Sequence, residues 1–130
     1  MGILGSSRHK QGLAAMTREE ALACRPIRHP EVLEVERRET ALVLSYPLQA
    51  RPWAASLLRR AGLLSDRRVM RKLELDAMGM AVWEMVDARR TVAEIIRRFA
   101  ERYQVLEREA ELSVTQFLRA LGRRGLIGFK

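Results

Sequence analysis

The stretch that decides the fold is VMRKLELDAMGMAVWEMV, residues 69–86. From Val69 to Leu75, successive side chains alternate with a period of two, which predicts a β-strand. One face of this strand carries Val69, Arg71, Leu73 and Leu75, and the other carries Met70, Lys72 and Glu74. Asp76 is a favourable N-cap, so a helix is predicted to follow at about 77–87. Its apolar stripe consists of Met78, Val82, Met85 and Val86, with Trp83 beside it.

Two more helices are expected downstream. Thr91 and Glu94 have the spacing of a capping box, in which each side chain accepts from the backbone amide of the other. The apolar stripe that follows comprises Val92, Ile95, Ile96, Phe99 and Tyr103. A third helix is predicted over about 107–122, because its glutamates gather at the end that favours negative charge. Its buried stripe comprises Ala110, Val114, Phe117, Leu118 and Leu121, and residues 126–129 are expected to form a last short β segment.

Upstream, residues 32–36 and 40–46 have the composition of two strands, with 37–39 as a hairpin loop. Together with 69–75 they predict an N-terminal three-stranded antiparallel sheet followed by a three-helix bundle, an α+β fold of winged helix-turn-helix type. Residues 1–24 are expected to be a flexible tail with a helical turn near 17–23. Residues 48–68 are interpreted as an insertion with a short helix that begins after Pro52 and ends before Gly62, in a domain that spans 25–130.

Composition narrows the class of protein. The chain has 130 residues, 48% of them hydrophobic and 31% charged, which fits one globular domain and argues against a mainly disordered chain. No apolar run is long enough for a membrane span, and no secretory signal is visible. The one cysteine, Cys24, excludes an internal disulfide and fits a reducing compartment. A cytoplasmic protein that makes no membrane contact is expected.

Catalytic and metal-binding patterns are missing from the sequence. The two histidines, His9 and His29, have no partner at metal-ligand spacing. Cys24 lies near His29, but nothing marks an orienting group or an oxyanion site. The glycines form no phosphate-binding loop. We therefore expect a protein that is not an enzyme and has no catalytic residues, no metal and no cofactor.

A formal charge of +8 and a helix-turn-helix make a DNA-binding protein the first alternative. The acidic start of the third helix, with Glu107, Glu109 and Glu111, argues against this function, because phosphate contacts dominate affinity for DNA. A DNA-binding protein of this kind would bind duplex DNA in a salt-sensitive way, and its binding would weaken when Arg119, Arg123 and Arg124 are replaced by alanine. A third hypothesis is a structural adaptor that docks on a larger enzyme through the basic insertion.

The ordered series of motifs resembles the pyrroloquinoline quinone biosynthesis protein D (PqqD) family, also called the RiPP recognition element. The resemblance over 69–129 rests on LELD (73–76), AVWEMVD (81–87), RTVAEII (90–96), FAERY (99–103), EAE (109–111), FLRAL (117–121) and RGLI (124–127). Residues 25–32 and 43–47 match the family's first two strands. Two features depart from the family: the 48–68 insertion, and Ala88 in place of the glycine that usually follows the aspartate at the end of the first helix.

The resemblance implies a non-catalytic module that binds the leader of a ribosomally made precursor peptide and presents it to a modifying enzyme, often of the radical SAM class. The peptide would add a strand to the third β-strand and rest against the third helix. The predicted peptide-binding residues are Val69, Met70, Arg71, Lys72, Leu73, Glu74, Leu75, Ser113, Phe117, Ala120 and Leu121. Arg67, Arg68, Arg71 and Lys72 flank this edge and would attract an acidic peptide. The expected partners are the leader peptide and the enzyme, with nucleic acid unlikely and the module a monomer or a weak homodimer.

Overall fold

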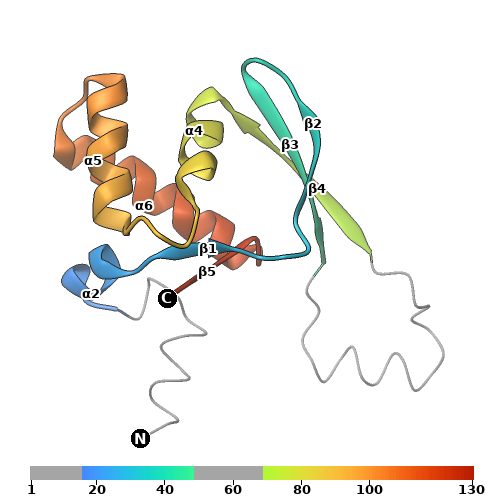
Figure 1. Cartoon of the computed structure of the whole chain (residues 1–130), viewed down its shortest axis with the longest axis horizontal. Helices are drawn as coiled ribbons and strands as arrows, with labels where there is room; N and C mark the ends of the chain where they lie inside the picture. Colours follow the sequence, from blue (N-terminus) through green and yellow to red (C-terminus); the bar gives the residue numbers. More distant parts are fainter. Residues whose placement is uncertain (1–15, 49–68) are drawn as a thin grey trace, which may run out of the picture.

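The computed structural model describes residues 16–48 and 69–130, which form a mixed α+β structure with two antiparallel sheets (Figure 1). The elements are, in chain order, α2 (Arg18–Ala23), β1 (Pro26–Arg28), β2 (Leu33–Arg37), β3 (Ala41–Pro47), β4 (Met70–Asp76), α4 (Ala77–Met85), α5 (Val92–Tyr103), α6 (Glu107–Arg123) and β5 (Ile127–Phe129). The sequence interpretations for residues 1–15, for most of the 48–68 insertion with its short helix, and for Arg67 and Arg68 lie outside the described residues.

The three strands predicted from the sequence form one antiparallel sheet in the order β2-β3-β4. Their bounds lie within about one residue of the prediction, as expected for element ends. In β3, the central strand of this sheet, side chains of one face are fully buried, including Leu42 and Leu44, because this face packs against the helices. The sheet lies to one side of the helices, with α4 directly following β4 (Figure 1).

A second sheet, which the sequence analysis did not expect, pairs β1 with β5, with Pro26 opposite Phe129. Arg25 and Lys130 extend this pairing by exchanging backbone hydrogen bonds of 2.9 Å. The resemblance assigned the family's first strand to residues 25–32. In the structure, the strand beside β3 is β2, and 26–28 pairs with the end of the chain instead. Local patterns do not reveal this pairing, because the two segments lie at opposite ends of the described chain.

The three predicted helices are present. The Thr91 hydroxyl accepts from the Glu94 amide at 3.2 Å, and the Glu94 carboxylate accepts in return from the Thr91 amide, so the capping box is confirmed. The stripe of α5 is buried as expected, apart from the partly buried Tyr103. The prediction for Met78 was wrong: this side chain is 47% exposed. It lies in the first turn of α4, immediately after the strand, where the core does not extend.

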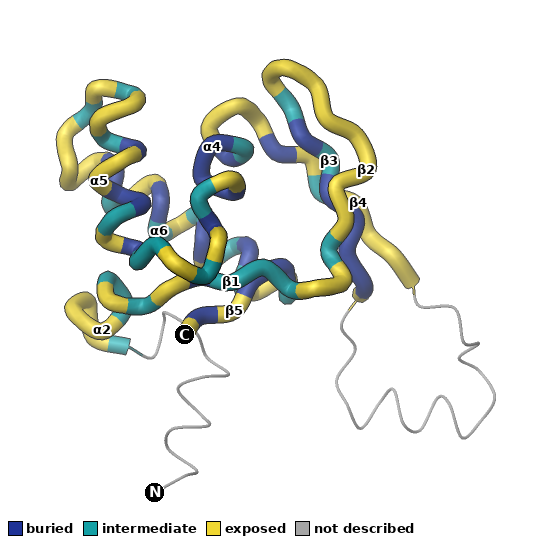
Figure 2. Tube along the Cα trace, in the orientation of Figure 1, coloured by how far each residue is buried: buried dark blue, intermediate teal, exposed yellow. Residues whose placement is uncertain are grey.

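The core joins the inner face of the sheet to the helices. Figure 2 shows buried residues along β3 and on the inward sides of α4, α5 and α6, whereas β2 is exposed throughout. Each large side chain removed from water in this core contributes about 1.5–3 kcal/mol. The largest side chains with almost no exposure are Trp83, Leu42, Leu44, Ile95, Leu118, Leu121 and Leu126.

The short helix α2 is packed against this core. The Thr17 hydroxyl caps it by accepting from the Glu20 amide at 3.1 Å. Arg18 donates to the Glu111 carboxylate on α6 at 2.7 Å. The packing side chains on and around this helix are Met16, Ala21, Leu22 and Cys24. Residues 16–24 are therefore part of the packed structure.

Candidate functional site

The outer edge of β4 is the first feature of the candidate site. Within the described ranges, β4 pairs with β3 alone, so its other edge has no strand beside it. The β3–β4 register runs without a bulge from Pro47 opposite Met70 to Ala41 opposite Asp76. A regular strand with one unpaired edge offers a row of N–H and C=O groups to another extended chain.

The register tells which backbone groups face outward. The Leu48 amide donates to the Val69 carbonyl at 2.8 Å, so Val69 points its polar groups toward β3. Because an antiparallel ladder alternates, the groups of residues 71, 73 and 75 also point inward, and those of Met70, Lys72 and Glu74 point outward. Pro47, which has no N–H, lies opposite Met70, where the ladder needs no donor.

Helix α6 supplies the wall beneath this edge. Its buried stripe of Ala110, Val114, Leu118 and Leu121 fixes its rotation about its axis. The adjacent row, at positions i, i+4, i+7 and i+11, then faces β4, as helical periodicity requires. This row consists of Ser113, Phe117 and Ala120 on the helix, continued by Arg124 at its C-cap.

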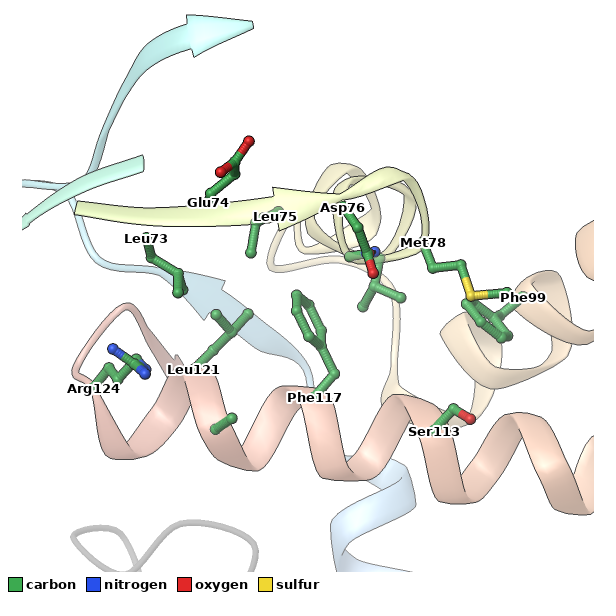
Figure 3. Close-up of a pocket in the computed structure, with 13 residues that line it drawn as sticks. Leu73, Glu74, Leu75, Asp76, Met78, Phe99, Ser113, Phe117, Leu121 and Arg124 are labelled. Carbon is green, nitrogen blue, oxygen red and sulfur yellow. The ribbon is translucent and has the colours of Figure 1, made fainter. Parts of the chain in front are cut away.

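Between the strand and the helix lies an open, mostly apolar cavity of about 370 Å³, which we name the β4–α6 groove (Figure 3). In the close-up, Leu73 and Leu75 project from the strand toward Leu121 and Phe117 on the helix. Met78 and Phe99 lie near its far end. The groove is lined by Leu73, Glu74, Leu75, Asp76, Met78, Gly79, Val82, Phe99, Ser113, Phe117, Ala120, Leu121 and Arg124.

Gly79 gives the Phe117 ring room at the base of the groove. A Cβ atom at position 79 would lie 3.1 Å from Phe117 Cε2, closer than ordinary van der Waals contact. The Gly79 amide also donates to the Asp76 carboxylate at 2.8 Å, which caps α4. A larger residue at this position would therefore displace the Phe117 ring.

The two ends of the groove differ in charge. At one end, Arg124 donates from Nη1 to the Tyr46 hydroxyl at 3.1 Å, and Tyr46 lies opposite Arg71 in the sheet. At the other end is the Asp76 carboxylate. The Lys72 ammonium lies on the opposite face of the sheet, where its charge helps to lower the pKa of Glu36, after the larger effects of Arg38.

The structure brings together seven of the eleven predicted site residues. Leu73, Glu74 and Leu75 line the groove, as do the four helix residues Ser113, Phe117, Ala120 and Leu121. Leu121 is only 1% exposed and is mainly a core residue. The other four predicted residues lie on β4 or at its start but do not line the groove: Val69, Met70, Arg71 and Lys72.

Sequence reasoning missed six lining residues. Arg124 follows Phe117 and Ala120 at helical spacing, so the row on α6 contained the signal. Met78, Val82 and Phe99 had been assigned to the core, because an apolar stripe does not distinguish the floor of a groove from a packed interior. Asp76 and Gly79 had no pattern that pointed to the site, since their position depends on the tertiary structure.

The described residues hold no group of three or more metal-ligating side chains. Burial raises the pKa of the Cys24 thiol, which lies 3.5 Å from the Met16 sulfur. A raised pKa is the opposite of what activates a nucleophilic cysteine. In the same ranges, no helix is long and apolar enough to cross a bilayer.

Comparison with known proteins adds one finding. The model of the family described as coenzyme PQQ synthesis protein D (PqqD) matches residues 63–127, half of the 130-residue chain. The matched range contains β4, α4, α5 and α6 and so includes both walls of the β4–α6 groove. No curated protein and no solved structure gives a significant match.

Proposed function

The chain belongs to the PqqD family, and on that premise we propose that it is a non-catalytic chaperone for a precursor peptide. It binds the leader segment of a ribosomally synthesised peptide by strand addition to β4. It then presents this peptide to a modifying enzyme of the radical SAM type. In this proposal the β2-β3-β4 sheet is the wing of a winged-helix-like unit, and the leader extends that wing by one strand.

One observation carries the proposal: within the described residues, the unpaired edge of β4 lies directly above an apolar groove. Outward N–H and C=O groups at Lys72 and Glu74 bind any extended backbone, so on their own they give affinity without specificity. Side-chain pockets add specificity, because every second residue of an added strand points toward the helix. The two features together form a site for an extended peptide.

The distribution of charge gives no support to DNA binding. Residues 16–48 and 69–130 contain 17 Lys and Arg and 15 Asp and Glu, a net of +2 out of the +8 of the chain. Most of the basic excess therefore belongs to residues outside the described ranges. The groove, in contrast, is mainly apolar, which suits side chains of a peptide better than phosphates.

The test is a substitution that removes one outward amide and leaves the β3–β4 ladder intact. Lys72→Pro deletes the N–H that the leader needs, and proline is tolerated on the free side of an edge strand. Lys72→Ala keeps the N–H and is the matched control. With an extended leader peptide as ligand, Lys72→Pro is expected to weaken binding at least tenfold, while Lys72→Ala changes it less than about threefold.

Thermal unfolding of both variants shows whether the fold is retained. Equal affinities of the full-length Lys72→Pro and Lys72→Ala proteins for the leader, with both folded, would contradict strand addition at β4. Val35→Pro, on the opposite edge of the same sheet, is expected to leave the affinity unchanged.

A further inference from the structure

Strand addition to β4 fixes which side chains of the bound peptide meet the groove. The outward groups of Lys72 and Glu74 bond to alternate peptide residues, as in any antiparallel ladder. The peptide residues between those lie directly opposite Arg71, Leu73 and Leu75 and point to the same face of the sheet. The protein therefore contacts three side chains of the peptide, which lie at alternate positions along it.

Two of these positions face apolar surroundings. The positions opposite Leu75 and Leu73 lie over the Phe117 ring, with Met78 and Phe99 at the far end of the groove (Figure 3). The carboxylate of Asp76 at this end is already bonded to the Gly79 amide. A negative side chain here would lie beside a like charge, so this end favours apolar residues.

The third position faces cations. Arg71 shares the strand face of Leu73 and Leu75, and the Tyr46 hydroxyl across from it accepts from Arg124. Within the described residues, Arg71 and Arg124 form no ion pair with a carboxylate, unlike the arginines of β2 and its turn. Arg124 lines this end of the apolar groove, and Arg71 lies beyond it on the same strand face, opposite the Tyr46 that Arg124 contacts. Two guanidinium groups on the path of the peptide favour a carboxylate as ligand.

Resting on the function proposed above, we propose that the β4–α6 groove selects a leader segment with two apolar residues and one acidic residue at successive alternate positions. The acidic side chain lies between Arg71 and Arg124. The peptide runs antiparallel to β4, as β3 does on the other edge, so the order from its N-terminus is apolar, any, apolar, any, acidic. The substrate class is therefore an extended, amphipathic acidic peptide.

Synthetic peptides test this reading directly on the full-length chain. The probe is Thr-Leu-Thr-Phe-Thr-Glu-Thr, compared with the same peptide carrying Gln for Glu and with the reversed order Thr-Glu-Thr-Phe-Thr-Leu-Thr. Affinities come from amide shifts of ¹⁵N-labelled protein at up to millimolar peptide. The Glu peptide is expected to bind about fivefold more tightly than either of the other two at low salt. This preference should shrink in 1 M NaCl, where the Debye length falls to about 3 Å.

Variants assign the preference to the two cations. Arg71→Gln combined with Arg124→Gln should reduce the Glu-to-Gln preference below about twofold, whereas Arg124→Lys, which keeps the charge, should retain most of it. Arg123→Gln, at the exposed neighbouring position of α6, is the matched control and should leave the preference unchanged.

The outcomes separate this inference from the proposed function. Equal affinities for the Glu and Gln peptides would contradict selection of an acidic residue. A preference for Glu that survives in the double variant would contradict its assignment to Arg71 and Arg124. Both outcomes leave strand addition to β4 intact. Tighter binding of the reversed peptide overturns the antiparallel order. No shift at any β4 amide with any of the three peptides overturns strand addition at β4 and this inference with it.

Discussion

The two edges of the β2-β3-β4 sheet are built differently. All five residues of β2 are exposed, and its register with β3 is broken by a bulge between Glu34 and Glu36. Arg37 pairs with Glu34 at 3.0 Å and with Glu84 at 2.9 Å, and Arg38 in the following turn pairs with Glu36. The β4 edge has a regular register, and an apolar groove lies beside it.

This difference shows which edge is protected from other chains. A bulge and a cover of charged side chains are devices by which proteins keep an edge strand from pairing. The β2 edge has both. The β4 edge also carries charged side chains, at Arg71, Lys72 and Glu74, but it has no bulge, and its neighbouring helix presents apolar side chains to an incoming strand. We infer that the sheet is closed to partners at β2 and open at β4.

Filling the β4–α6 groove is expected to have the largest effect on the affinity for the leader. Ala120→Trp places an indole where the apolar residues of the leader would lie, and each such residue contributes about 1.5–3 kcal/mol when buried. Binding of the leader should weaken more than tenfold, measured by titration calorimetry. Leu112→Trp, at a position of α6 that is 61% exposed and outside the groove, is the control. Equal affinities of the two variants would place the binding site elsewhere.

Removing a contact to the β2 edge should reduce the stability of the protein without weakening leader binding. The buried Trp83 donates from Nε1 to Glu34 at 3.3 Å, and the Arg28 guanidinium lies 4.5 Å from its ring centroid. Trp83→Phe removes the donor and leaves a small cavity, so the free energy of unfolding in urea should fall by about 2 kcal/mol. Affinity for the leader should not change, because β4 is untouched. An affinity loss as large as that of Ala120→Trp would show that the two edges are coupled.

A stabilised variant separates binding from stability. Ala88 has φ 67°, a left-handed conformation that costs an L-residue about 1 kcal/mol. The Asp87 carboxylate holds this turn by accepting from the amides of Arg89 and Arg90. Ala88→Gly relieves this strain, but glycine loses more entropy on folding than alanine does. The free energy of unfolding should therefore rise by only about 0.5 kcal/mol. A leader-binding defect of Lys72→Pro that disappears in the Ala88→Gly background would be a stability effect and not a lost amide.

The smallest expected effect is electrostatic, at the β2 edge. A hydrogen bond from Arg38 and then its charge lower the pKa of Glu36, with a smaller contribution from Lys72. Stabilisation by this pair is therefore complete above the ordinary pKa of 4.5 and is lost as the pH falls through the lowered value. In a ¹³C carboxyl titration, Arg38→Gln should raise the pKa of Glu36 more than Lys72→Ala does. The reverse order would contradict the pairing within this edge.

Local patterns predicted most of the fold but only part of the site. The alternation at residues 69–75, the cap at Asp76 and the box at Thr91 are interactions between neighbours in sequence, so their positions were predictable. The β1–β5 pairing and the contact of Gly79 with Phe117 depend on tertiary structure and were not. Ala88 shows an intermediate case: the missing glycine was visible in the sequence, but its cost depends on a left-handed φ that the structure reveals.

Amide hydrogen exchange along β4 tests the central claim most directly. In the free protein, the amides of Met70, Lys72 and Glu74 should exchange rapidly, while those of Arg71, Leu73 and Leu75 are protected by β3. Addition of the leader should slow exchange at Lys72 and Glu74 at least tenfold, with little change at Leu73 and Leu75. Protection of the outward amides before any peptide is added, or their continued rapid exchange in the complex, would contradict the account.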